Sequence, residues 1–442
     1  MPVAASTSYA GAAAIHAGYY PGGKLSGNAT EADDASGGGA TPGLPSTAGG
    51  GATDGSASAS GGATGPVVPT WRQGLTVLAA TYISSNTIAD VDPALDAAIN
   101  GNSPQTRTNA NWTPNGSVLA LFDQWTGMAW CEALQEATAI GGGHAGWQGN
   151  CGFPICLDDN APAFARRGYP SGSLQKPLPG GTNIGQAGSN NALVPDDRPA
   201  AVHSYNLLAA MPGGDVLLAP SGGRHLNGAG VFTPNGYRFG RSGADWDTSV
   251  AFAAPTAGTV QAGSACYDPV RDCLWGLMGP NLAKWDRATG TRTITINNGA
   301  MSGYYSRLIY DAARDLVWVF FGQAGSGGFA SGTLGYFNPA SGTTITLVTD
   351  GAATLRGGWA ITHDTTRDRF ILWNGSSTQL TVMPIPANIN SDTFTSSTLS
   401  VSGGIDVAGA QGSFSQLHYS KKYDGVLKCS DASKKMQFIP FS

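Results

Sequence analysis

A short pattern recurs in the second half of this chain and constrains its fold more than any other feature. It reads as an aromatic residue or His, then Asp-x-x-Arg-Asp, then an apolar run. The clear copies begin at Tyr267, Tyr310 and His363, and a degenerate copy runs from Tyr419 to Leu427. Successive copies are about 43, 53 and 56 residues apart. Periods of about 40 to 50 residues are typical of β-propeller blades, each a four-stranded sheet.

The residues of this pattern are typical of a turn between two strands. An Asp side chain can accept hydrogen bonds from the backbone of its own bend, and the Arg can form an ion pair with a flanking Asp. Because these residues recur in register, we expect them to be structural rather than catalytic. The residues concerned are Asp268, Arg271, Asp272 and Trp275; Asp311, Arg314, Asp315 and Trp318; and Asp364, Arg367, Asp368 and Ile371.

A second recurring turn reads aromatic, Asp or Asn, two residues, Thr or Ser, then Gly. Its copies begin at Phe122, Trp285 and Phe337. Gly adopts a positive φ without steric penalty, so we expect glycines such as Gly290 to close these hairpins. With both turns in one repeat, each blade contains two hairpins.

The sequence therefore predicts an all-β protein whose residues 71–442 form a β-propeller. Six blades are expected, with seven as the alternative. The final segment has too few strands for a full blade, and the runs at 75–83 and 87–91 are candidates to complete it and close the ring. The predicted blades lie near residues 112–165, 200–250, 260–298, 305–350, 358–402 and 412–442.

Residues 1–70 are dominated by Gly, Ala, Ser and Thr, without the glycine period of collagen. Such a segment buries too little apolar surface to offset a chain entropy of about 1–2 kcal/mol per fixed residue. We expect an extended arm that a partner surface or a symmetry copy orders, with pockets for Ile15, Tyr19, Tyr20 and Leu44. The alternative is an arm that lies on its own domain.

Charge and hydropathy exclude several classes of protein. Only 12% of residues are charged, against about 25% in typical soluble domains, and the net charge is −5. No dense basic stripe is present, so a nucleic-acid partner is not expected. No apolar run approaches the roughly 18 residues of a membrane span. The first basic residue is Lys24, so we expect synthesis in the cytoplasm without Sec export.

The cysteines leave one question open. Six are present without a CxxC pair, which gives no support for zinc. Cys266 and Cys273 flank a predicted turn, where a disulfide is geometrically possible. Reduced, packed thiols are the alternative, and the sequence favours them in a protein made in the cytoplasm. Cys151 and Cys156 present the same two alternatives.

Three short motifs carry a resemblance to known proteins: GGGH at 141–144, HSYN at 203–206 and PSGGRH at 220–225. They resemble kelch-type propellers, and the body from 112 to 442 is similar to kelch-like propellers of tailed-phage structural genes. The resemblance implies a virion component, anchored by its arm in the capsid, neck, tail or fibre. Other virion proteins, symmetry copies and a host-surface glycan are the partners it implies.

Two further functions compete with this one. A propeller can bind or cleave carbohydrate, and a kelch-like propeller can be an interaction module of a cell. Aromatic residues in Gly-rich contexts are candidates for stacking against sugars: Trp147, Tyr304, Tyr305 and Trp359.

The sequence shows no motif that assigns chemistry. The histidines suggest no copper set, and no carboxylate pair or nucleophile motif is evident. We therefore assign no catalytic, cofactor-binding or metal-binding residue and expect that the chain is not an enzyme. The histidines considered are His144, His203, His225, His363 and His418.

Overall fold

The computed structural model contains a six-bladed β-propeller in the compact unit of residues 65–442. The predicted arm lies outside the described residues, including Ile15, Tyr19, Tyr20 and Leu44. The described residues are 68–91, 118–122, 126–141, 150–168, 199, 204–220, 224–226, 229–231, 235–242, 245–253, 263–278, 281–297, 305–321, 333–348, 359–375, 378–407 and 413–442.

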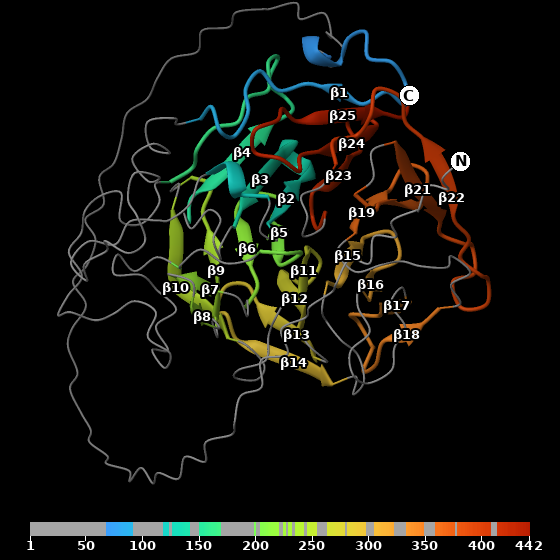
Figure 1. Ribbon diagram of the computed structural model, residues 1–442. Helices are drawn as coiled ribbons and strands as arrows, with labels where there is room; N and C mark the ends of the chain where they lie inside the picture. Colours follow the sequence, from blue (N-terminus) through green and yellow to red (C-terminus); the bar gives the residue numbers. More distant parts are fainter. Residues whose placement is uncertain are drawn as a thin grey trace, which may run out of the picture. The chain divides into compact units, whose positions relative to one another are not determined.

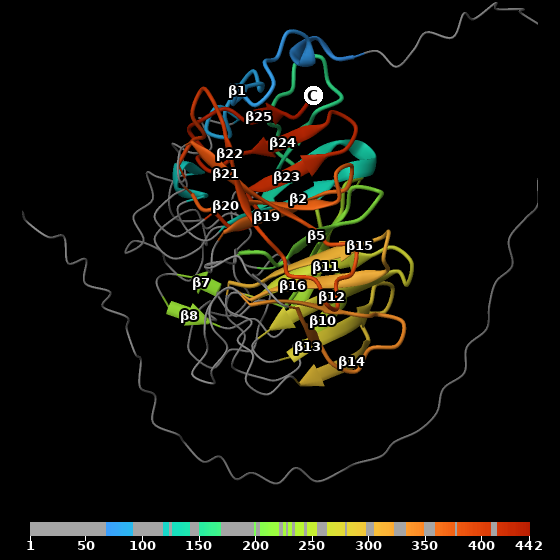
Figure 2. The ribbon, with the colours of Figure 1, turned by 90° about the vertical axis from the view of Figure 1, so that its right-hand side faces the viewer.

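Blades 3, 4 and 5 are regular antiparallel sheets whose four strands follow chain order from the centre outward. Figure 1 shows β11, β15 and β19 near the centre of the ring and β14, β18 and β22 at its outside. Figure 2 shows the four strands of blade 3 side by side. The strands are β11 Ser264–Asp268, β12 Cys273–Met278, β13 Asn281–Asp286, β14 Arg292–Asn297, β15 Arg307–Asp311, β16 Leu316–Phe320, β17 Leu334–Phe337, β18 Thr346–Leu347, β19 Ala360–Asp364, β20 Arg369–Trp373, β21 Gln379–Pro384 and β22 Ser397–Ser400.

The second strand of each regular blade is apolar because neighbouring blades cover both of its faces. In β12 and β16 every residue is buried, and the sequences CLWGLM and LVWVF have no polar face. Continuous apolar runs are typical of strands that are covered on both sides. Trp275 in β12, Trp318 in β16 and Trp373 in β20 are fully buried and fill the space between blades.

Blades 1 and 2 depart from this regular plan. Blade 1 has three strands among the described residues, and a separate hairpin, β7–β8, interrupts blade 2 between its second and third strands. Among the described residues, the short 3-10 helices are η1 Thr70–Arg72, η3 Val118–Ala120 and η4 Glu132–Leu134. The strands are β2 Gly127–Cys131, β3 Glu136–Ile140 and β4 Gly152–Cys156 in blade 1; β5 Leu208–Ala210, β6 Val216–Leu218, β9 Asn235–Phe239 and β10 Trp246–Ala253 in blade 2; and β7 Arg224–Leu226 and β8 Ala229–Val231 in the hairpin.

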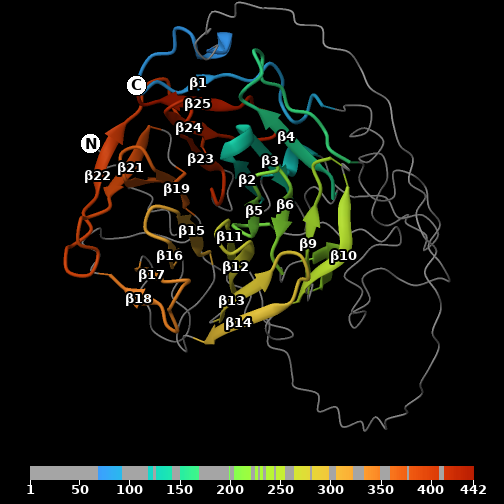
Figure 3. The ribbon, with the colours of Figure 1, turned by 180° about the vertical axis from the view of Figure 1, so that it is seen from behind.

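Blade 6 is completed from the other end of the propeller. Its strands β23 (Leu417–Ser420), β24 (Gly425–Lys428) and β25 (Gln437–Pro440) come last in the chain, and β1 (Thr81–Tyr82) pairs antiparallel with β25. Figure 3 shows β1 beside β25 from behind. A strand from the range 75–83 therefore closes the ring, which leaves no open seam between the first and last blades.

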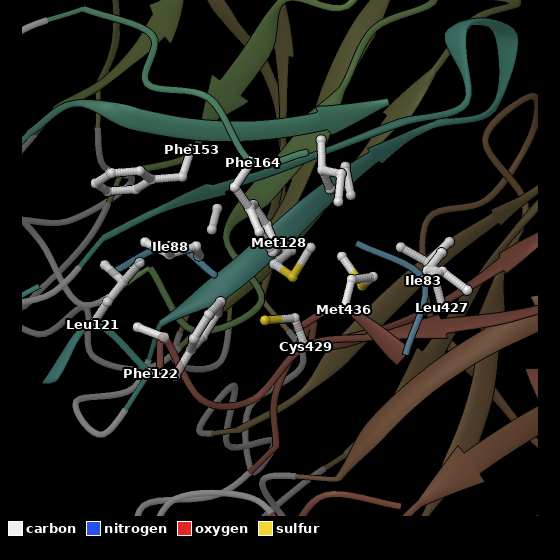
Figure 4. Close-up of a cluster of buried hydrophobic side chains, with 14 of the residues drawn as sticks. Ile83, Ile88, Leu121, Phe122, Met128, Phe153, Phe164, Leu427, Cys429 and Met436 are labelled. Atoms are coloured by element: carbon white, nitrogen blue, oxygen red, sulfur yellow. The ribbon is translucent and has the colours of Figure 1, made fainter. Parts of the chain in front are cut away.

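Apolar side chains hold this closing segment in place. Ile83 and Ile88 belong to a buried cluster that also contains residues of blades 1 and 6. In Figure 4 Ile83 lies next to Leu427, and Ile88 lies near Leu121. At about 1.5–3 kcal/mol for each fully buried aliphatic side chain, this packing stabilises the closure far more than two backbone pairs do.

The six sheets confirm the six-bladed prediction and exclude the seven-bladed alternative. They fall within the predicted ranges, except that β10 ends at Ala253, three residues beyond 250. Described residues include no helix long and apolar enough to cross a membrane.

The two recurring turns obtain their bends differently. In the Asp-x-x-Arg-Asp turns the second Asp, not a Gly, takes the left-handed conformation, with φ between 46° and 53° at Asp272, Asp315 and Asp368. In the second turn Gly290 has the expected positive φ of 70°. The same expectation is wrong for the other two glycines of this pattern: Gly127 and Gly342 do not have a positive φ.

Close packing explains those two glycines. A Cβ at Gly127 would lie 2.0 Å from the carbonyl oxygen of Tyr205, and one at Gly342 would lie 2.5 Å from that of Asn338. Gly127 also opens β2 instead of joining a third and fourth strand.

All six cysteines are free, which confirms the reduced thiols that the sequence favours for both pairs. Cys266 pairs across the hairpin with Trp275, and Cys273 pairs with Asp268, so the two thiols are diagonal neighbours and not opposite each other. Cys151 and Cys156 lie at the two ends of one extended segment. Five residues of strand span about 16 Å, more than twice the reach of a disulfide.

Candidate functional site

The Asp-x-x-Arg-Asp turns all join the first strand of a blade to its second, so they share one face of the ring, called here the turn face. The first Asp of each copy is the centre of its turn. Asp268 is fully buried and accepts hydrogen bonds from the backbone N–H groups of Val270 and Arg271, at 3.0 and 3.1 Å. The indole Nε1 of Trp275 donates to it at 3.2 Å. The carboxylate therefore fixes both the bend and the buried Trp.

The Arg of each turn connects its blade to the next one. Arg271 Nη1 donates one hydrogen bond to Asp268 in its own turn, at 2.9 Å, and another to Asp315 in blade 4, at 2.7 Å. Arg314 contacts both oxygens of Asp368 in blade 5 in the same way. The planar guanidinium matches a carboxylate with two parallel hydrogen bonds, which makes these pairs strong and directional.

A third pair continues the series from Arg367 of blade 5 to Asp424 of blade 6, with contacts of 2.6 and 2.7 Å. We call these three inter-blade pairs the arginine ladder. The sequence predicts the ion pair within each turn, which is confirmed, but not the second contact 44 to 57 residues away.

The ladder changes the acidity of its carboxyl groups. The hydrogen bond from Arg271, with a further one from Tyr310, lowers the pKa of Asp315 to about 2. Arg314 lowers the pKa of Asp368, and Arg367 lowers that of Asp424. These groups therefore stay ionised until the pH is strongly acidic.

The ladder ends where the repeat degenerates. In the copy of blade 6, Ser420 and Tyr423 stand where the other copies have Asp and Arg. Ser420 Oγ donates to Oε1 of Gln135 at 2.5 Å, and Gln135 has the left-handed φ of 50° that Asp has elsewhere. At the other end, Asp272 is bound by Arg287 of its own blade.

A cavity of about 580 Å³ lies at the centre of the ring and is the candidate functional site. The innermost strand of every blade contributes to its lining, and Glu132, Thr365 and Lys421 line it at the turn face. Tyr205, Tyr305 and Phe414 precede the innermost strands of blades 2, 4 and 6 and do not belong to the lining.

These three rings pack together at the beginning of the innermost strands. Their centroids are 5.3 Å apart for Tyr205 and Phe414, and 5.5 Å for Tyr305 and Phe414. Tyr205 and Tyr305 both have a positive φ, so the surrounding structure holds their backbones in an unusual conformation.

Short hydroxyl side chains join the innermost strands of neighbouring blades. Ser264 Oγ accepts the backbone N–H of Leu308 at 2.7 Å, and Thr362 Oγ1 accepts that of Tyr419 at 3.0 Å. The inner edge of a blade has no further strand to pair with, and these contacts satisfy part of it. The small polar residues of the first strands thus position the cavity wall.

Arg307, His418 and Cys266 are polar groups of the cavity that come from three different blades. Burial lowers the pKa of Arg307 to about 10. Burial first, and the charge of Arg307 second, lower the pKa of His418 to about 3, so this imidazole is neutral at physiological pH. Burial raises the pKa of the Cys266 thiol, which is therefore protonated.

Two of the five histidines considered from the sequence, His363 and His418, line the cavity. His225 lies in β7, and His144 and His203 lie outside the described residues. Among the residues that the structure describes, no cluster of three or more His, Cys, Asp and Glu is placed to hold a metal ion.

The sugar-stacking candidates do not form a common surface. Tyr305 packs in the aromatic cluster with Phe414, and Trp359 packs against the buried cluster between blades 4 and 5. Trp147 and Tyr304 lie outside the described part of the chain.

Sequence reasoning missed Arg307 as a cavity residue. It was visible only as one member of a small, alternating strand, and nothing local distinguishes it from a solvated Arg. The available signal was its position at the start of a predicted innermost strand, where the matching residues of blades 3 and 5 are the small Ser264 and Ala360.

Comparison with known proteins gives no family. No family model and no curated protein matches the chain. Similar solved structures include an auxiliary nutrient binding protein from Bacteroides thetaiotaomicron, at 8% identity and a TM-score of 0.42, covering 81% of this chain and 75% of that chain. The Niastella koreensis GH74 enzyme has 12% identity and a TM-score of 0.40, with 74% and 50% covered.

The β-propeller domain of Myceliophteria thermophila Cps50 (Swd1) has 10% identity and a TM-score of 0.39, with 71% of this chain and 96% of that chain covered. The assignment of six blades rests on the strand pairing of the chain itself.

Proposed function

We propose that this protein is a non-catalytic structural component of a tailed-phage virion, in which the propeller is a rigid domain and residues 1–70 are the anchoring arm. The arginine ladder is the observation that supports a structural role. It uses the repeated charged residues of the turn face to tie blades 3, 4, 5 and 6 to one another.

Rigidity is what such a part requires. Blades that are joined by bidentate ion pairs and closed by an N-terminal strand resist sliding past each other, because any relative movement breaks directional contacts. A rigid ring can keep its outer surface in a fixed orientation on a particle.

The virion setting comes from the resemblance of the motifs at 141–144, 203–206 and 220–225 and from the composition of residues 1–70. An extended arm can contact several neighbouring subunits, and its ordering is then offset by the area that it buries. The proposed partners are other virion proteins and copies of this chain, with a host-surface glycan as a further one.

The test uses particles purified by density gradient from a host culture that carries the gene. We expect the full-length chain to sediment with the particles and residues 1–70 to be protected from protease there, but to be cleaved in the purified protein. The propeller, which we expect to resist protease in both samples, is the internal control. A chain that stays in the soluble fraction, or that depolymerises purified host polysaccharide, contradicts the proposal.

A further inference from the structure

The cavity contains a guanidinium that has no carboxylate to balance it. Arg307 makes no ion pair among the described residues; its Nη1 donates to Ser415 Oγ, and its Nε is buried without a hydrogen-bond partner. Buried charges in proteins are as a rule paired, because removing an ion from water is expensive. Arg271, in the arginine ladder, has two carboxylate partners and shows the contrast.

The neighbours of Arg307 add hydrogen-bonding capacity but no negative charge. His418 is neutral, and its Nε2 is buried without a partner in the part of the chain that the structure describes. The carboxylate among the described lining residues is that of Glu132, and it is already engaged by Trp130 Nε1 at 2.9 Å and by the backbone N–H of Lys421 at 3.1 Å. With Arg307 and Lys421 as its cations, the lining has a net positive charge.

The remaining wall is largely apolar and of a size that suits a small molecule. Met128, Leu208, Ala265 and Leu308 contribute hydrocarbon surface from four blades. The volume of about 580 Å³ lies within the range of roughly 300–1,000 Å³ that is typical of ligand sites. Apolar walls with a few convergent polar groups are the usual composition of such sites.

We propose that the central cavity binds a small carboxylic acid in its ionised form, with an apolar body, and that the carboxylate lies against Arg307 and His418. The ligand supplies the missing counter-charge and gives the unpaired Nε an acceptor, while its body lies against the apolar wall. This binding site is additional to the structural role and does not depend on the virion setting.

The test is calorimetric titration of the full-length protein at neutral pH with acetate, butanoate, benzoate and the neutral isostere benzamide. We expect benzoate to bind with a Kd below about 1 mM. Benzamide should bind at least about tenfold more weakly, because it cannot form a charge-assisted pair with Arg307. Affinity should rise about tenfold from acetate to butanoate as two methylene groups are buried.

Two variants with the same change in charge locate the anion. Arg307→Met should lower benzoate affinity at least about tenfold and leave benzamide affinity unchanged. Without ligand it should melt no lower than the wild type, since it removes an uncompensated charge. Lys435→Met, which removes an exposed cation outside the cavity lining, should keep benzoate affinity within about threefold.

Three outcomes overturn the proposal. They are a wild type that binds none of the carboxylates, a wild type that binds benzamide as tightly as benzoate, and a chloride titration that stabilises the protein as much as benzoate does. Each of them is measured on the wild type, so the decision does not depend on whether Arg307→Met folds. Equal loss of benzoate affinity in Arg307→Met and Lys435→Met also contradicts it.

Discussion

Two arcs of the ring differ in how their blades are joined: one repeats a single kind of link, and the other uses a different contact at each step. In blades 3, 4 and 5 the same three charged residues recur in each turn, and the Arg of each turn links its blade to the next, as far as Asp424 of blade 6. From blade 6 through blades 1 and 2 each link occurs once. They include the hydrogen bond between Ser420 and Gln135, the ion pairs Lys422–Asp158 and Arg241–Glu136, and the closing strand β1. The repeated turn in the sequence thus produces a repeated link between blades, whereas the closure of the ring uses contacts that each occur once.

The two arcs differ most at the residue of each turn that has the left-handed backbone conformation. Gln135, Asp272, Asp315, Asp368 and Asp424 all have a left-handed backbone, so the bend itself is common to both arcs. Only the Asp residues can form an ion pair with an Arg of a neighbouring blade. A turn can therefore keep its shape while losing its link, and backbone geometry and inter-blade stability are separable.

The largest expected effect comes from removing the closure. A chain that begins at residue 92 lacks β1 and also Ile83 and Ile88, which exposes the edge of β25 and part of the core. We expect it to aggregate or to lose cooperative unfolding, measured by circular dichroism and light scattering. The control begins at residue 65 and retains the whole compact unit. Equal melting temperatures of the two chains would show that the closing strand is dispensable.

The second-largest effect is expected from the loss of one Arg–Asp pair of the arginine ladder. Arg314→Met leaves Asp311, whose side chain is 1% exposed, without its cation, and should lower the free energy of unfolding by about 2–4 kcal/mol. Arg238→Met removes a more exposed pair within blade 2 and should lower it by less than about 1 kcal/mol. Chemical denaturation measures both. Similar losses in the two variants would mean that the inter-blade position adds nothing.

A turn that lies outside the ladder is the third site. Gly290 has a φ of 70°, and a Cβ there would lie 2.3 Å from the carbonyl oxygen of Ala251 in blade 2. Gly290→Val should therefore lower the free energy of unfolding by about 2 kcal/mol. Gly213→Val is the control, because a Cβ at Gly213 meets no atom within 4 Å. If thermal melting does not distinguish the two variants, the steric argument for this turn is wrong.

The smallest expected effect is the response of the ladder to acid. The pKa of Asp315 in the folded protein is about 2, below its value of about 4 in an unfolded chain. Its contribution to stability is therefore complete above about pH 4 and is lost as the pH falls from about 4 to about 2. Asp315→Asn should be less stable at neutral pH and should show a shallower decline in that window. Parallel curves from urea titrations at several pH values would contradict this assignment.

The sequence predicted the number of blades and the local role of the turns because both depend on residues close together in the chain. The spacing of the copies and the Asp-Arg pair within each copy are local quantities. The contact between Arg271 and Asp315 depends on the angle and distance between successive blades, which no local pattern specifies. The recurrence of both residues in register was a signal that could have suggested it.

The cavity was less predictable for a related reason. His363 and His418 were considered as candidates, but their convergence with Arg307 requires the ring to be closed. Whether a charged side chain in the cavity has a counter-charge depends on the side chains that the other blades place beside it. The missing partner of Arg307 is a property of the assembled wall, and no single strand contains it.

Closure of the ring by β1 also decides how the propeller bears a load. Arg72 donates to the carbonyl oxygens of Tyr423 and Ser442, and Thr81 pairs with Phe438, so the chain enters and leaves through the same blade. The contacts of Arg72 and β1 with blade 6 resist tension that is applied through both ends. Blades 3, 4 and 5, which the arginines join, lie outside the path of the force and keep their form while these contacts are pulled apart.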